Sequence, residues 1–185
     1  AIVFPDTYTN YSRQSVGKAT VEVLEAAGVH VDVAETSDSG RPAYSKSFVD
    51  VARRTARENV TRFEGRIEDG WSIVTTEPSD AVMFQHDYRD LLSGPAVSRV
   101  AANTYAPTEF LDAFDLVPEL PVDAPAESAP YHCHCSQYAD GTDHHTWMGL
   151  SAAGFKFAEL DSAFRRLAGT LGDDAHPHAP NTYSR

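Results

Sequence analysis

The segment Tyr131-His132-Cys133-His134-Cys135 is the densest group of metal-binding side chains in the sequence. Thiolates and imidazoles are the ligands that zinc and iron–sulfur centres use. We therefore take His132, Cys133, His134 and Cys135 as candidate metal ligands, with Cys133 and Cys135 as the candidate ligands of a redox cofactor. On a strand, the histidines and the cysteines would point to opposite faces, so the four can meet only if the strand ends within the motif.

Two explanations of this motif stay open. A tetrahedral metal site would need further ligands, and the candidates are His144, His145, His176 and His178. Alternatively, the motif is the end of a strand with two buried, unreactive cysteines, because free cysteine is among the most buried residue types. The strand-end carboxylates of Asp6, Asp38, Glu77 and Asp80 could form an acidic pocket. We interpret them as solvated loop residues, since loop carboxylates are expected in so acidic a chain.

Composition limits the classes of partner and compartment. The chain has 185 residues with 27 acidic against 15 basic side chains, a net charge of −12, which disfavours nucleic acid as a partner. With 42% hydrophobic residues the chain has enough for one core, and no apolar run approaches the ~20 residues of a membrane span.

The three lysines and the evenly spread acidity favour a halophilic origin over an ordinary acidic cytosolic protein. Two cysteines one residue apart are poorly placed for a disulfide and indicate a reducing, cytoplasmic compartment.

The elements that would position these side chains alternate between strands and helices. Residues 1–4 and 71–76 form buried apolar runs, and 29–33 alternate as a strand does. Helical spacing predicts one helix that ends at Gly28 and a second that begins near Phe48. Asp80 is the predicted cap of a further helix that runs toward Leu92. The abrupt start on a strand leads us to expect a fragment of a larger protein without a secretory leader.

The end of the chain repeats its beginning. A shift of 126 residues places Leu24–Val29 on Leu150–Phe155 and Phe4–Tyr8 on Pro130–His134. This predicts an α/β fold of duplicated β-α-β units that form a mostly parallel sheet with flanking helices. The expected organisation is a first half at 1–116, a Pro-rich connector at 117–130 and a second half at 131–185. In such sheets ligands bind beyond the carboxyl ends of the strands, here the loops 5–13, 35–44, 77–80, 132–143 and 161–172.

Several segments resemble the cysteine-rich "CCG" domain. This domain closes FAD-linked D-lactate, glycolate and D-2-hydroxyglutarate dehydrogenases. It also occurs in the anaerobic glycerol-3-phosphate dehydrogenase C subunit and the heterodisulfide reductase B subunit. The chain is most similar to the version in FAD-linked oxidases of halophilic archaea. The similar segments are 4–10, 16–19, 24–29, 40–45, 77–81, 100–105, 131–135, 160–162 and 168–172.

The resemblance implies a duplicated α/β domain that binds an iron–sulfur cluster through paired cysteines, with electrons arriving from a flavin. The sequence departs from that pattern at the ligand positions. Asp38-Ser39-Gly40 stands where the first half has Cys-Cys-Gly, Pro5-Asp6-Thr7 where a strand-end cysteine is often found, and Ala163–Arg166 where the second half has its cysteine pair. Cys135 matches a family ligand position, and Cys133 is additional. A cluster normally needs four thiolates, so we expect this segment not to hold one, with zinc as the alternative metal.

The resemblance therefore leaves two functional hypotheses. In the first, the chain is the C-terminal domain of an FAD and iron–sulfur oxidoreductase that oxidises a small D-2-hydroxy acid of the lactate or glycolate class, or glycerol-3-phosphate. The FAD would lie on a flavin domain of the same protein or on a partner subunit, and the assembly would lie at most peripherally on the inner face of the membrane. In the second, the segment is a non-catalytic scaffold or a small-ligand or metal-binding module derived from that domain.

Overall fold

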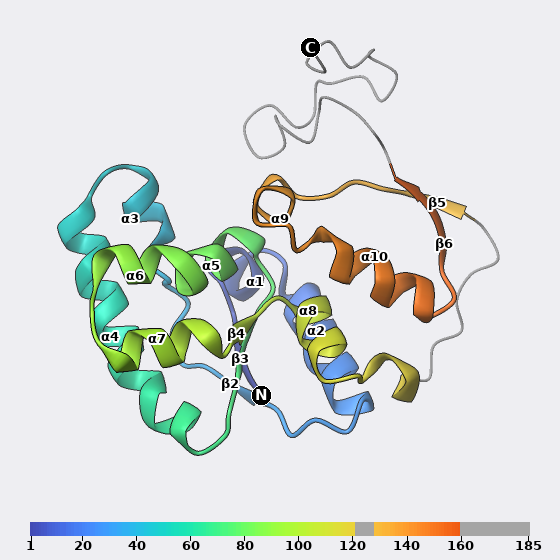
Figure 1. The fold of residues 1–185 in the computed structure, drawn as a ribbon, viewed down its shortest axis with the longest axis horizontal. Helices are drawn as coiled ribbons and strands as arrows, with labels where there is room; N and C mark the ends of the chain where they lie inside the picture. Colours follow the sequence, from blue (N-terminus) through green and yellow to red (C-terminus); the bar gives the residue numbers. More distant parts are fainter. Residues whose placement is uncertain (121–127, 160–185) are drawn as a thin grey trace, which may run out of the picture.

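A computed structural model describes residues 1–120 and 128–159 of the chain. Its centre is a sheet of four parallel strands in the order β2-β1-β3-β4 (Figure 1). The strands are short: β1 (Ile2–Phe4), β2 (Asp32–Val33), β3 (Ile73–Thr75) and β4 (Thr104–Tyr105). The predicted α/β class with a mostly parallel sheet and flanking helices is confirmed.

Helices cover both faces of this sheet, with α2 and α8 on one side and α4, α6 and α7 on the other (Figure 1). A π-helical turn at Met83–Asp87 links α5 to α6, and a 3₁₀ turn at Val117–Glu119 follows α8. The α-helices of this part are α1 (Thr7–Tyr11), α2 (Gln14–Ala26), α3 (Arg41–Ser45), α4 (Val49–Glu68), α5 (Pro78–Val82), α6 (Tyr88–Leu91), α7 (Pro95–Ala102) and α8 (Pro107–Ala113).

The alternation of strand side chains divides the core into two clusters. Phe4 and Ile73 point toward α4 and the π turn, where the ring of Phe84 lies 5.1 Å from that of Phe4. Val3 and Val74 point the other way, toward Leu24 of α2 and the residues of α8. The fully buried β1 and β3 are therefore central strands, and their carboxyl ends are fixed by packing on both faces.

Some predicted boundaries need correction. The first and third strands and the helix that ends before Gly28 form as expected, and Gly28 takes the left-handed φ of +78°. Of the predicted strand 29–33, Asp32–Val33 pairs with β1. Asp80 does not cap a helix, because Glu77, three residues earlier, accepts the bond from the Ser79 amide. Pro78 fills the first helical position, where its missing N–H costs no bond, so the helix begins before Asp80.

The end of the described chain repeats the order β1-α1-α2-β2. Its elements are β5 (Ser128–Tyr131), α9 (Cys135–Asp140), α10 (Asp143–Ala152) and β6 (Lys156–Glu159), and β5 pairs with β6 in parallel. The offset of 126 residues found in the sequence carries the end of α2 at Ala26 onto the end of α10 at Ala152. Both helices end at a glycine with positive φ, followed by a bond of 3.0 Å from the next amide back to the last turn. The backbone thus bears out the duplication.

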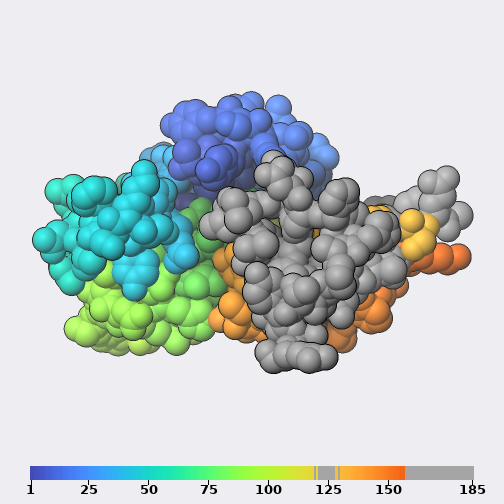
Figure 2. Space-filling view, turned by 90° about the horizontal axis from the view of Figure 1, so that it is seen from above, coloured from blue at the N-terminus to red at the C-terminus, as the bar shows by residue number. Residues whose placement is uncertain are grey.

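We call residues 1–120 the first unit and residues 128–159 the second unit. β5 begins within the predicted connector 117–130, whose first residues form the 3₁₀ turn. The predicted boundaries at 116 and 131 themselves stay a prediction. In Figure 2 the first unit forms one continuous mass in blue, cyan and green, with the orange residues of the second unit beside it.

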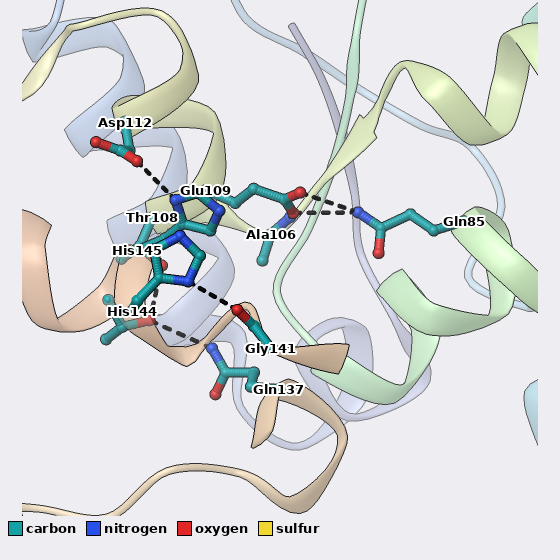
Figure 3. A network of polar contacts seen from close by, with 10 residues as sticks. Gln85, Ala106, Thr108, Glu109, Asp112, Gln137, Gly141, His144 and His145 are labelled. Atoms are coloured by element: carbon teal, nitrogen blue, oxygen red, sulfur yellow. Dashed lines mark hydrogen bonds and ion pairs between the residues drawn. The ribbon is translucent and has the colours of Figure 1, made fainter. Parts of the chain in front are cut away.

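A polar network on α8 joins the two units (Figure 3). Nδ1 of His145 on α10 lies 2.6 Å from a carboxylate oxygen of Asp112 on α8. The hydroxyls of Thr108 and Thr146 lie 2.8 Å apart, also across this boundary. Glu109 of α8 closes the network on the side of the first unit by accepting bonds from Gln85. Helix α8 is therefore shared between the units.

Over residues 1–120 and 128–159, no helix has the length and apolar character needed to cross a bilayer.

Candidate functional site at the strand ends

A cavity of about 650 Å³ lies at the carboxyl ends of β1, β2, β3 and β5. Four of the loops named from the sequence line it, and the fifth, 161–172, lies outside the described residues. We call this cavity the strand-end pocket. Its lining side chains are mostly carboxylates and hydroxyls, namely Asp6, Thr7, Tyr8, Ser37, Ser39, Arg41, Pro42, Ser45, Glu77, Ser79, Asp80, His134, Cys135 and Ser136.

Asp6 fixes the loop after β1. One of its carboxylate oxygens accepts the amides of Tyr8 and Thr9, at 2.8 and 3.1 Å, and so caps α1. The other accepts the hydroxyl of Thr9 and, at 2.8 Å, the hydroxyl of Thr76 after β3. The side chain is 2% exposed, so its hydrogen-bonding capacity is used within the protein.

The loop after β2 is held from inside the core. The Asp38 carboxylate accepts the Gly40 amide at 2.8 Å. The buried Tyr88 hydroxyl donates to the Ser39 carbonyl at 2.8 Å, and Asn59 of α4 donates both to that hydroxyl, at 2.9 Å, and to the Asp38 carbonyl, at 2.8 Å. Burial raises the pKa of Tyr88 above its ordinary value, so the phenol is a neutral donor.

The loops after β3 and β5 face each other across the pocket. Glu77 accepts the amide and the hydroxyl of Ser79 at 3.3 and 2.8 Å. His134 accepts the Ser136 amide on Nδ1 at 3.1 Å and so caps α9. In the neutral ring the proton then lies on Nε2, which is 3.8 Å from the Glu77 carboxylate.

Asp80 is the carboxyl group in the pocket that caps no helix. It is 7% exposed and accepts a hydrogen bond of 2.5 Å from the Ser39 hydroxyl. Burial raises the pKa of Asp80 to about 7, the Ser39 bond opposes that rise, and the carboxylates of Glu77 and Asp6 add to it. The guanidinium of Arg41 lowers it slightly but is bound to Asp87 at 2.7 Å. Near neutral pH this carboxyl group can therefore hold or release a proton.

The candidate ligands in residues 132–135 are separated by the structure. β5 ends at Tyr131, before the motif, so strand alternation does not apply. His134 and Cys135 line the strand-end pocket, whereas His132 and Cys133 do not. The Cys133 thiol is 1% exposed and donates to the His134 carbonyl at 3.3 Å, and the Cys135 sulfur lies 4.0 Å from Nδ1 of His134.

Two of the further histidines proposed as ligands, His144 and His145, do not line this pocket. His144 and His145 lie in the first turn of α10. Nδ1 of His144 contacts the Gly141 carbonyl at 2.7 Å, and His145 contacts Asp112. His176 and His178 lie outside the described residues, as does the 163–166 segment that stands where the family has its second cysteine pair.

The donor set of the strand-end pocket does not fit an iron–sulfur cluster. One thiol, that of Cys135, lines the pocket, whereas a cluster normally takes four. Within 1–120 and 128–159, no three histidine, cysteine, aspartate or glutamate side chains are grouped so as to hold a metal ion. The carboxylates of Asp6, Asp38 and Glu77 are already bound by backbone amides. Zinc on residues 132–135 stays a prediction that needs ligands from elsewhere.

The sequence pointed to the right loops but not to all the residues that line or support the pocket. Asp6, Glu77 and Asp80, which we interpreted as solvated, line the pocket, and Asp6 and Asp80 are buried. Asn59 and Tyr88 were missed. Asn59 had a readable signal, because it is a polar residue within the apolar stripe that includes Ala52, Ala56 and Phe63 on α4.

The chain is similar to several curated proteins named "Lactate utilization protein A". The protein of Geobacillus thermodenitrificans (strain NG80-2) is 32% identical over 134 residues, which are 69% of this chain and 52% of that protein. The protein of Anoxybacillus flavithermus (strain DSM 21510 / WK1) is 35% identical over 129 residues, 65% of this chain and 51% of the relative. The protein of Bacillus thuringiensis (strain Al Hakam) is 35% identical over 103 residues, 52% of this chain and 41% of the relative.

The chain spans about half the length of the curated relatives it matches. No family model matches the sequence. No solved structure matches it either.

Proposed function

We propose that this chain is a domain of a lactate utilization protein and takes part in lactate oxidation together with partner subunits. The observation that carries the proposal is the similarity to proteins of that name at 32% identity over 134 residues. The resemblance to the closing domain of FAD-linked D-2-hydroxyacid dehydrogenases agrees with it, because lactate is a substrate of that class. The flavin partner, the electron-transfer role and the halophilic origin stay predictions.

We further propose that this segment acts as a scaffold and does not carry an iron–sulfur cluster. Its support is the chemistry of the strand-end pocket, where Asp6 and Ser39 lie in loops in which the resemblance implies thiolates, and the Asp80 carboxyl group lines the same pocket. Iron–sulfur clusters are held by cysteine thiolates, whereas carboxyl and hydroxyl oxygens are the ligands of harder metal ions. Lactate oxidation would then be performed by the partners that this domain helps to assemble.

Elemental analysis tests the second part of the proposal. The protein is purified anaerobically, and its visible spectrum, iron, zinc and acid-labile sulfide are measured. We expect no charge-transfer absorption and less than about one tenth of an equivalent of either metal, since even weak structural sites retain more. Stoichiometric iron with sulfide would overturn the scaffold role, and stoichiometric zinc would replace it with the metal-binding alternative.

A genetic test separates the biological role from the cluster. Deleting the gene for the full-length protein in its source organism should abolish growth on lactate and leave growth on glucose unchanged. A matched rescue with Cys133→Ala/Cys135→Ala should restore growth as well as the wild-type gene does, because a scaffold needs neither thiol. Normal growth of the deletion strain on lactate would refute the role in lactate oxidation. Failure of the double variant alone, although it folds, would refute the scaffold role.

A further inference from the structure

One hydrogen bond between buried side chains joins the loops after β2 and β3. The Ser39 hydroxyl donates to the Asp80 carboxyl at 2.5 Å, and the two residues are 1% and 7% exposed. We propose that this pair is a proton-dependent clasp that closes the strand-end pocket in place of a metal centre. Ser39 lies in the Asp38-Ser39-Gly40 loop, where the resemblance implies paired cysteines. A proton on Asp80 would therefore hold the loops together, as a bound cluster would in a cluster-binding domain.

In the closed state the Ser39 side of the clasp is held in place by the core. Its carbonyl is held by the Tyr88 hydroxyl, and the neighbouring Asp38 carbonyl by Asn59. Gly40 has a φ of +86°, and a Cβ there would lie 3.3 Å from the Ala52 carbonyl oxygen of α4. The loop therefore sits against the core, and a change at Asp80 must be absorbed on the β3 side or by breaking the bond.

The charges around Asp80 oppose its ionisation. Glu77 and Asp6 both place negative charge near it. Arg41 is the nearby cation, and its guanidinium is already bound to Asp87 at 2.7 Å. Across the pocket, His134 faces Glu77 and not Asp80. A carboxylate formed at Asp80 would be buried and, among residues 1–120 and 128–159, would have the Ser39 hydroxyl as its donor, which is too little to offset its lost hydration.

The direction of the pH effect follows from the raised pKa of Asp80 in the folded protein. At a pH below the pKa that Asp80 has when exposed, the carboxyl group is protonated in both the closed and the open state, and the closed state keeps the full stability that this group contributes. That contribution falls as the pH rises and is gone once the pH passes the folded value of about 7. Between about pH 5 and pH 8 we therefore expect opening of the two loops to increase by roughly tenfold or more.

Hydrogen exchange measured by mass spectrometry tests the clasp on the full chain at about pH 5 and pH 8, after correction for intrinsic exchange rates. In the wild-type protein, protection of peptides covering 35–47 and 76–82 should fall by roughly tenfold or more at the higher pH. Asp80→Asn keeps an oxygen that can accept the Ser39 bond but cannot ionise, so its protection should change by less than about threefold. Equal pH dependence in the two proteins, or none in the wild type, would overturn the clasp.

Two further arms keep the test decisive. Ser39→Ala should lower protection of both peptides at both pH values, because the bond is lost whatever the charge on Asp80. If Asp80→Asn fails to fold, the proposal fails with it, because a neutral acceptor at this position should preserve the fold. EDTA should leave wild-type protection unchanged, and a fall on chelation would mean that a metal closes the pocket. None of these readouts involves lactate, so their failure is distinct from failure of the proposed function.

Discussion

The two units of the chain contain the same succession of elements but are stabilised differently. In the first unit, β1 is buried along its whole length and Leu24 of α2 is 1% exposed. In the second, Leu150 occupies the equivalent position on α10, yet that helix contains no buried residue. The first unit covers its sheet with α4, the π turn, α6 and α7, and the described part of the second has no counterpart of them. Local sequence signals are thus enough to repeat the succession of strands and helices. A hydrophobic core depends in addition on the further helices that pack around them.

The same contrast appears where each unit closes its first strand-end loop. Asp6 caps α1 and also binds Thr76 in the loop after the neighbouring strand β3, so it ties two loops together. His134 caps α9 in the equivalent loop and faces Glu77 of the first unit at 3.8 Å. The loop of the first unit is therefore held by a residue of its own unit, while the loop of the second unit faces a residue of the first unit.

The largest expected difference is between two matched core truncations. Leu24→Ala should reduce the free energy of unfolding by about 2–5 kcal/mol, because it empties a buried site. Leu150→Ala, at the equivalent partly buried position, should cost less, about 1–2 kcal/mol, since part of that side chain is already exposed. Both residues line one apolar cavity of about 630 Å³ between the units, so they are matched in surroundings as well as in sequence.

Urea unfolding of the two variants, followed by circular dichroism, measures both costs. Equal losses of stability would break the comparison, because they would mean that the second unit has a core as tight as that of the first.

This contrast also explains what could be predicted from the sequence. Gly28 and the offset of 126 residues are local signals, and they fixed the helix ends and the duplication. The convergence of loops followed from the parallel sheet alone. The burial of Asp80 did not, because it depends on the packing of the loop after β2, 41 residues away, against it. The division of residues 132–135 between the pocket and its surroundings depends in turn on β5 ending at Tyr131.

A smaller effect tests what the units share. Gly28 and Gly154 both follow a helix with positive φ, +78° and +89°, where any other residue costs about 1–2 kcal/mol. Gly28→Ala should therefore destabilise the protein by that amount, since a Cβ there meets no other atom and the cost is in the backbone alone. Gly154→Ala should cost the same, as measured by thermal unfolding.

Gly65→Ala within α4 is the matched control for these two variants. It lies inside a helix with open space around its Cβ, so alanine should stabilise it by about 0.5–1 kcal/mol. An unchanged midpoint of thermal unfolding for Gly154→Ala would show that the second unit lacks the shared helix end.

The smallest effect concerns the contact between the units. His145 and Asp112 meet at 2.6 Å with side chains 21% and 35% exposed, and partly exposed pairs of this kind contribute about 0.5–1 kcal/mol. A double-mutant cycle with His145→Ala and Asp112→Ala should give a coupling free energy of that size. Because salt screens such a pair, the coupling should shrink in molar potassium chloride. A coupling near zero at low salt would mean that the units are held by the Thr108–Thr146 bond and the packing of α8 against α10 instead, and that the first unit stabilises the second through shape and not charge.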